Sequence, residues 1–171
     1  MNASQVSPKE YLAFYAKYLD KAGSVDLIPG LQNGFKLTLS FFESISEAKF
    51  EYKYAEGKWT IKELIQHIID TERVFTYRAL HFAREDANVL EGFDENDYAV
   101  SSMANNRSKE SLIDEYKALK RSTILLFSSF TNDMLMRIGV ASGGYMSVRA
   151  IAFVIIGHEA HHCEVIKERY L

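Results

Sequence analysis

The sequence predicts an all-α protein, an antiparallel four-helix bundle with an additional short N-terminal helix. Four long stretches of the 171-residue chain carry apolar residues at alternating spacings of three and four, which places those residues on one face of a helix. The only prolines, Pro8 and Pro29, lie near the start of the chain and leave the later helices uninterrupted. Together these observations favour a bundle of long helices.

Composition limits the classes of protein to consider. With 171 residues and 47% apolar content, we expect one domain over residues 1–171 that buries a core without disulfides. The single cysteine excludes an internal disulfide, and neither a signal peptide nor an apolar run of about 20 residues is evident. The net charge of -3 is spread along the chain. We therefore expect a cytoplasmic protein that binds neither nucleic acid nor a membrane.

The short N-terminal helix is predicted to start at Pro8. Ser7 can serve as its N-cap, Pro8 takes the first helical position and Glu10 completes a capping box. The aromatic residues that follow are too numerous for a free tail. We therefore expect this segment to lie across the bundle until Gly23 ends it.

Two long helices follow. The first begins near Asp26, and its apolar stripe comprises Ile28, Leu31, Phe35, Thr38, Phe42 and Ile45. The second begins at Thr60, where Glu63 can complete a capping box. Its stripe comprises Leu64, His67, Thr71, Val74 and Arg78. His67 is thus expected at the edge of a buried face.

The segment between about Glu85 and Arg107 has no sustained periodicity and is predicted to be a long loop, packed through Phe93 and Tyr98. Ser108 caps a third long helix, whose stripe comprises Leu112, Tyr116, Leu119, Thr123, Leu126 and Phe130. A second predicted loop ends in Ser142-Gly143-Gly144. Ser147 then caps the fourth helix, whose stripe comprises Val148, Ile151, Ile155, His158, His162, Val165 and Arg169.

Histidines on two of these stripes predict a metal site. His158 and His162 lie one helical turn apart, so both imidazoles can reach one ion, and His67 is the candidate for a third ligand. Three histidines with a position left for water suit zinc, nickel or ferrous iron in a catalytic site. The alternative is that each histidine is a core residue bonded to a neighbour. Two histidines on an apolar stripe would, however, be costly to bury without a common partner.

Other reactive side chains have weaker claims on this site. His161 could replace His162 as a ligand, although it breaks the stripe, and His81 lies away from the stripe of His67. Cys163 points roughly 100° around the helix from His162, so packing is the favoured role for it. Glu63 and Asp70 flank His67, and either could accept a proton from an imidazole or from bound water.

Several segments resemble the DinB-like metal-binding four-helix bundle family, from about Asp26 to the end of the chain. The matching residues are Trp59-Thr60, Glu63, His67, Asp70, Glu72, Arg78-Ala79-Leu80, Phe82-Ala83-Arg84, Gly92-Phe93-Asp94, Gly157-His158-Glu159, His161-His162 and Glu168-Arg169-Tyr170. The resemblance implies one divalent metal held by three histidines, at the positions of His67, His158 and His162. Relatives in that family include bacillithiol-type S-transferases and mycothiol-dependent maleylpyruvate isomerases.

The resemblance also implies a low-molecular-weight thiol cofactor, such as bacillithiol, that the metal activates for transfer to a small electrophile. Metal-dependent hydrolysis is the alternative, with Asp70 or Glu159 as general base. A non-enzymatic module that binds a metal or a ligand is the competing class. The sequence leaves the oligomeric state open, a homodimer included.

The position of the histidines in their helices predicts where the pocket opens. In an antiparallel bundle the site would lie near the start of the second helix and the end of the fourth, covered by residues from about Ala48 to Lys58 and by the C-terminal Arg169, Tyr170 and Leu171. The loop around Phe93 and the turn at Ser142 would then lie at opposite ends.

Overall fold

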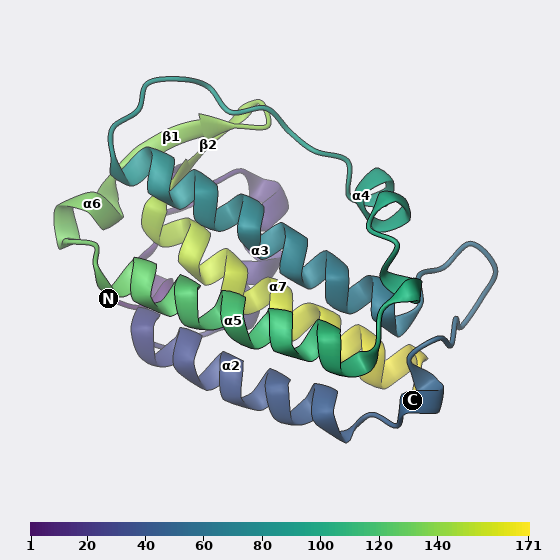
Figure 1. The fold of residues 1–171 in the computed structure, drawn as a ribbon. Coiled ribbons are helices and arrows are strands. Elements are labelled where there is room, and N and C mark those ends of the chain that lie inside the picture. The colour runs from purple at the N-terminus through teal and green to yellow at the C-terminus, as the bar shows by residue number, and fades with distance from the viewer.

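The computed structural model describes residues 1–171 and confirms the all-α class and the four-helix bundle (Figure 1). The long helices are α2 (Leu27–Ser44), α3 (Ile61–Ala83), α5 (Lys109–Ser128) and α7 (Val148–Arg169). The short ones are α1 (Ala16–Ala22), α4 (Glu95–Ser101) and α6 (Asn132–Met136), and a small sheet holds β1 (Ile138–Ala141) and β2 (Gly144–Ser147). None of these helices is both long and apolar enough to span a membrane.

Three of the long helices begin at the predicted caps. The Thr60 hydroxyl accepts a hydrogen bond from the backbone N–H of Glu63, and the Glu63 carboxylate accepts one from the backbone N–H of Thr60. The hydroxyls of Ser108 and Ser147 accept from the N–H groups three residues later. Each cap satisfies backbone donors that the first helical turn leaves free.

The directions of the helices depart in part from the prediction. α2 packs antiparallel to α5, and α3 antiparallel to α7, as expected. The neighbours α3 and α5 run parallel. The hydroxyl of Thr60, just before α3, donates to the side chain of Asn105, a few residues before α5, and Arg73 pairs with Glu115 further along both helices. α2 and α7 also run parallel, and Thr38 contacts Cys163 between them. An antiparallel order therefore describes only two of the four neighbouring pairs.

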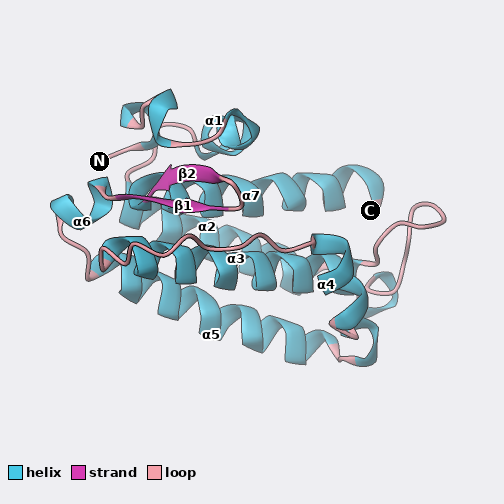
Figure 2. Cartoon of the chain, turned by 90° about the horizontal axis from the view of Figure 1, so that it is seen from above, coloured by secondary structure: helices cyan, strands magenta, loops and turns pink.

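A crossover connection, residues 84–108, makes the parallel pair of α3 and α5 and runs the length of the bundle (Figures 1 and 2). The prediction of an irregular loop here was wrong for residues 95–101, which form α4. The Asp94 carboxylate caps α4 by accepting from the N–H groups of Asn96 and Asp97. Only Ala99 of this helix is buried, so the segment has too little apolar periodicity to predict a helix.

The second predicted loop instead contains α6 and a β-hairpin. Strands β1 and β2 pair antiparallel, with Ile138 opposite Ser147 and Ala141 opposite Gly144. Ser142 and Gly143 form the two-residue turn, and both have positive φ, 53° and 73°. This backbone suits a tight hairpin, but Ser142 is not among the residues that usually mark one.

The N-terminal segment lies across α7, as predicted, but as two 3₁₀ turns, Pro8–Glu10 and Ala13–Tyr15, followed by α1. Gly157 permits this crossing, because a Cβ at that position would lie 1.8 Å from the carbonyl oxygen of Tyr18. Gly23 ends α1 with a φ of 64°. Other 3₁₀ turns are Ala3–Gln5, Glu47–Lys49 and Ala104–Asn106.

Helix α7 is the centre of the molecule. Its residues 148–159 are buried on every side, beyond the single stripe that the spacing predicted, because α1, α2 and α3 all pack on it. One apolar cluster surrounds its first half, up to Ile156, and a second surrounds Cys163, Ile166 and the C-terminal Tyr170. Between the two clusters α7 carries polar side chains, among them His158, Glu159 and His162.

Candidate metal centre

The structure brings the ring nitrogens of His67, His158 and His162 together. His67 projects from α3 and the other two from α7, and their potential ligand atoms all lie within 4.8 Å of one another. The Nε2 atom of His158 lies 3.1 Å from Nε2 of His67 and 3.1 Å from Nε2 of His162. All three Nε2 atoms therefore converge on one point between the two antiparallel helices.

Burial keeps these imidazoles neutral. Desolvation lowers the pKa of His67 to about 4, and desolvation together with the nearby His67 ring lowers the pKa of His162 to about 2. It also holds the pKa of His158 well below its usual range. The neutral imidazole is the form that binds metal ions.

The Nδ1 atoms are arranged unequally. Nδ1 of His67 lies 3.4 Å from the hydroxyl of Thr71, one turn further along α3. Nδ1 of His162 is buried and has no hydrogen-bond partner. When the Thr71 hydroxyl accepts a hydrogen bond from Nδ1–H of His67, the lone pair of that ring is on Nε2, directed at the other two histidines.

This donor set fits a divalent ion. Two nitrogens bound to one tetrahedral zinc ion are about 3.3 Å apart, given Zn–N bonds of roughly 2.0–2.1 Å, and the closest Nε2 pairs here are 3.1 Å apart. Without an ion, His158 Nε2 faces two other ring nitrogens, and one proton on it cannot serve both contacts. A shared cation would satisfy the cluster.

Aromatic rings enclose the three histidines. The Trp59 ring lies 4.9 Å from that of His67, and the Tyr18 ring meets that of His158 edge-on at 5.3 Å. Trp59 comes from the turn before α3 and Tyr18 from α1, so two separate parts of the chain limit the access of water to the cluster.

A cavity of about 490 Å³ opens from the histidines along α3. Its walls are aromatic and cationic, with one carboxylate. They comprise Phe14, Tyr15, Lys17, Tyr18, Trp59, His67, Thr71, Phe75, Arg78, Phe93, Glu95, Ser142, His158 and His162. The prediction that Phe93 and Ser142 lie at opposite ends was wrong, because the crossover carries Phe93 and the β1–β2 turn carries Ser142 to this one cavity.

A second cleft, of about 370 Å³, lies at the predicted end of the bundle, where Tyr54, Lys58, Arg169 and Tyr170 contribute to its walls. His162 lines both hollows, whereas His161 lines only this one and stands outside the three-nitrogen cluster. The predicted C-terminal cover therefore exists, but it borders the smaller of the two spaces.

The structure does not bring Asp70 or Glu63 to the cavity. Asp70 accepts a hydrogen bond from Gln66 and lies 3.7 Å from Arg73. Burial raises its pKa, against the opposing effects of Gln66 and Arg73. The Glu63 carboxylate is bound in the cap at Thr60. The residue of α3 that contacts the His67 ring is Thr71, for which the sequence predicted no role beyond its place on the stripe.

Glu159 also lies away from the three histidines, because it points about 100° around α7 from His158. It accepts from the hydroxyl of Tyr116 and pairs with Lys120 at 3.1 Å, and Lys120 also pairs with Glu72 at 3.0 Å. Burial raises the pKa of Glu159. Burial alone would lower the pKa of Lys120, but the two carboxylates raise it above its usual range.

Two further candidates have structural partners. His81 is buried, with Nε2 2.9 Å from the carbonyl oxygen of Asn88 and Nδ1 3.4 Å from Asp86. Cys163 packs against Thr38, and burial raises the pKa of its thiol to about 12. Lys17 and Arg78, in contrast, line the cavity and were missed. The signal available for Arg78 was a charged residue on a stripe predicted to be buried.

Comparison with known proteins supports a common origin for this arrangement. The sequence model of the DinB superfamily matches residues 31–166, which include all three clustered histidines. A curated protein of Oceanobacillus iheyensis, named "Putative metal-dependent hydrolase OB0413", is 26% identical over 126 residues, and the match covers 72% of each chain.

Solved structures share the fold. YfiT from Bacillus subtilis, described as "a probable metal-dependent hydrolase with an unusual four-helix bundle topology", matches with a TM-score of 0.74 at 15% identity, over 85% of this chain and 88% of YfiT. The mycothiol-dependent maleylpyruvate isomerase matches with a TM-score of 0.65 at 11% identity, over 90% of this chain and 62% of the isomerase. At such identities the structures establish the fold alone.

Proposed function

The chain belongs to the DinB superfamily, and from this premise we propose that it is a metal-dependent enzyme that transfers a low-molecular-weight thiol to a small electrophile. The observation that carries the proposal is the convergence of three histidine Nε2 atoms on one wall of a cavity of about 490 Å³. A hollow of this size accommodates a small molecule.

His67, His158 and His162 would hold one divalent ion through Nε2. Such an ion, when bound, supplies a Lewis acid that lowers the pKa of a thiol or water and polarises a carbonyl group. Thr71 would fix the ring of His67 by accepting a hydrogen bond from its Nδ1–H group. The rings of Trp59 and Tyr18 exclude water from two sides of the cluster.

The carboxylates around the site favour a thiol over water as the nucleophile. Hydrolysis benefits from a general base near the attacking water, and neither Asp70 nor Glu159 lines the cavity. Glu95, at the exposed start of α4, is the only carboxylate that does. A thiol has a much lower pKa than water and depends less on such a base.

Metal-dependent hydrolysis is the second candidate, and the names of the Oceanobacillus protein and of YfiT favour it. In that reaction Glu95 would be the general base in place of Asp70 and Glu159. Its position on α4 would require the crossover to hold it over the histidines. Substitution of Glu95 by Gln should then lower hydrolysis and leave thiol transfer unchanged.

One electrophile distinguishes the two reactions. In p-nitrophenyl acetate, thiol transfer forms a bond between the sulfur and the acetyl carbon, p-nitrophenolate leaves with the electron pair, and the thiol proton passes to solvent. We would add zinc-loaded or nickel-loaded protein to this ester with and without bacillithiol, and identify the thioester or acetate by mass spectrometry. His158→Ala is the test variant and His161→Ala its control.

We expect release of nitrophenolate that depends on protein and bacillithiol, with the thioester as product, and its loss in His158→Ala only. Release without thiol would support the hydrolase. No release under either condition, with metal bound, would support a binding module instead.

A further inference from the structure

Arg78 differs from every other buried charged side chain of this protein. Seven such side chains are buried: Glu10, Lys62, Glu72, Arg78, Lys120, Arg149 and Glu159. Six of them form ion pairs with an opposite charge within 4.0 Å. Arg149, the other buried arginine, is paired with Glu10. Arg78 is 4% exposed and has no carboxylate partner.

The contacts of Arg78 are neutral. Its Nη2 atom donates to the hydroxyl of Ser142 at 2.7 Å and to the carbonyl oxygen of Glu91 at 3.3 Å. The guanidinium carbon lies 5.7 Å from the centre of the Phe75 ring. Nε and Nη1 donate to no protein group, so most of the N–H donors of this side chain lack a protein acceptor.

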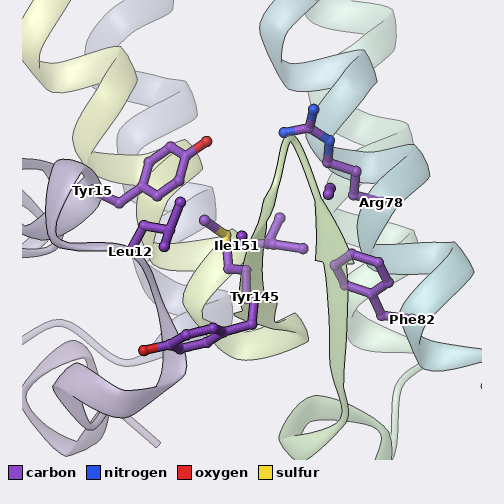
Figure 3. Close-up of a pocket in the computed structure, with 9 residues that line it drawn as sticks. Leu12, Tyr15, Arg78, Phe82, Tyr145 and Ile151 are labelled. Carbon is purple, nitrogen blue, oxygen red and sulfur yellow. The ribbon is translucent and has the colours of Figure 1, made fainter. Parts of the chain in front are cut away.

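Arg78 lines two hollow spaces. Figure 3 shows the side chain reaching the tip of the β1–β2 hairpin, with Tyr15 across a small pocket of about 10 Å³, a volume that holds a water molecule at most. Arg78 and Tyr15 also line the large cavity that contains the histidines. Arg78 thus borders a space that a ligand can enter.

A buried cation without a counter-charge is costly, because neutral contacts replace only part of its hydration. Lys17, at the same cavity, has no ion pair either, and its Nζ lies 4.8 Å from the rings of Phe14 and Tyr18. The one acidic residue of the lining, Glu95, is exposed and makes no ion pair with Arg78 or Lys17. The cavity therefore has an excess of positive charge before any metal is added.

We propose that Arg78 binds a carboxylate of the ligand, at the opposite end of the cavity from the three histidines. Arg78 lies eleven residues after His67, which is three helical turns on the same face and roughly 16 Å between the two Cα atoms. The ligand is then elongated, with its reactive end at the histidines and its carboxylate at Arg78. This assignment of the ligand class rests on the proposed function.

The test uses ω-mercaptocarboxylates of increasing chain length, each compared with the ω-mercapto alcohol of equal length. Trp59, the only tryptophan, contacts His67 and reports binding to zinc-loaded protein through its fluorescence. In wild type we expect the best-fitting carboxylate to bind about tenfold more tightly than its alcohol, as for one charged hydrogen-bonded pair. Equal affinities at every length would overturn the proposal.

Variants localise the effect. Arg78→Gln should abolish the preference for the carboxylate, whereas Arg73→Gln, the same change on the exposed side of α3, should retain it. Arg78→Lys keeps the charge and should keep a weaker preference, which provides a second reading if Arg78→Gln fails to fold. A full preference in a folded Arg78→Gln protein would place the carboxylate elsewhere and overturn the assignment.

A metal-free arm separates this proposal from the proposed function. After chelation, suberate should raise the Tm of wild type and of Arg73→Gln but not that of Arg78→Gln. That shift requires neither metal nor thiol. If it is seen while thiol-dependent turnover is absent, only the proposed function fails. If turnover is present and the shift and the carboxylate preference are both absent, only the role of Arg78 fails.

Discussion

Gly157 and Tyr18 make the closest backbone approach described for any glycine of this protein. A Cβ added at Gly157 would lie 1.8 Å from the carbonyl oxygen of Tyr18 and 2.9 Å from its Cα. Because the obstacle is backbone, no side-chain rotation relieves it. The α1 crossing, and with it the Tyr18 and Lys17 walls of the cavity, depends on this glycine.

Gly157→Ala should therefore lower the free energy of unfolding by about 3 kcal/mol, the upper part of the range for overpacking. Urea denaturation followed by circular dichroism measures the change. Gly34→Ala is the control, because its added Cβ would meet only the Glu159 carboxylate, at 3.1 Å. Equal effects of the two substitutions would show that α1 moves away from α7 at little cost.

The purified protein should hold about one divalent ion per chain, as expected for a single three-histidine site. His67→Ala, His158→Ala and His162→Ala should each lower the metal content measured by elemental analysis. His161→Ala should not, because His161 lies outside the cluster. Loss of metal in His161→Ala alone would refute this ligand set.

The metal-free protein should stay folded at neutral pH and lose stability in mild acid. Burial lowers the pKa of His67 to about 4 and of His162 to about 2, from an ordinary value of 6.5. Between these values the unfolded chain binds more protons than the folded chain, so the free energy of unfolding falls as the pH falls below about 6.5. The slope should be about 1.4 to 4 kcal/mol per pH unit, for one to three protons.

Urea titrations of chelated protein at pH 7.0, 6.5, 6.0 and 5.5 measure this slope before most carboxylates titrate. A variant with all three histidines replaced by glutamine should be flatter over the same range. An equally steep slope in that variant would assign the acid sensitivity to other groups.

Lys120→Met should cost about 3–5 kcal/mol of stability, because it leaves Glu72 and Glu159 buried without their shared cation. Lys117→Met, a change at the partly exposed surface of the same helix, should cost less than about 1 kcal/mol. Lys120→Met combined with Glu72→Gln and Glu159→Gln should recover much of the loss. If the triple variant is no more stable than Lys120→Met, the penalty comes from packing and not from unpaired charge.

Local signals in the sequence were sufficient for the long helices and for the histidine cluster. Thr60, Ser108 and Ser147 mark helix starts through contacts within one turn. The four-residue spacing of His158 and His162 places both side chains on the same face of one helix. His67 could be paired with them because its stripe had to face the core. These features depend on residues within a few turns of each other.

Features that depend on distant packing were not predicted correctly. The parallel pairing of α3 and α5 follows from the crossover, whose route is set by contacts such as the bridge between Leu90 and Ala141. Asp70 and Glu159 were plausible bases by distance along the helix, but each lies on a different face from its neighbouring histidine. Both residues are close to a histidine in sequence, but their side chains point around the helix axis away from the cavity.

The parallel pair of α3 and α5 also bears on how the chain folds. Helices joined by a short turn can dock as a local hairpin, whereas α3 and α5 can meet only after residues 84–108 have closed a long loop, at an entropic cost that precedes any packing gain. The central α7 is the last helix of the chain, so during synthesis the earlier helices emerge before the element on which they pack. Folding should therefore be completed late, after α7 has left the ribosome.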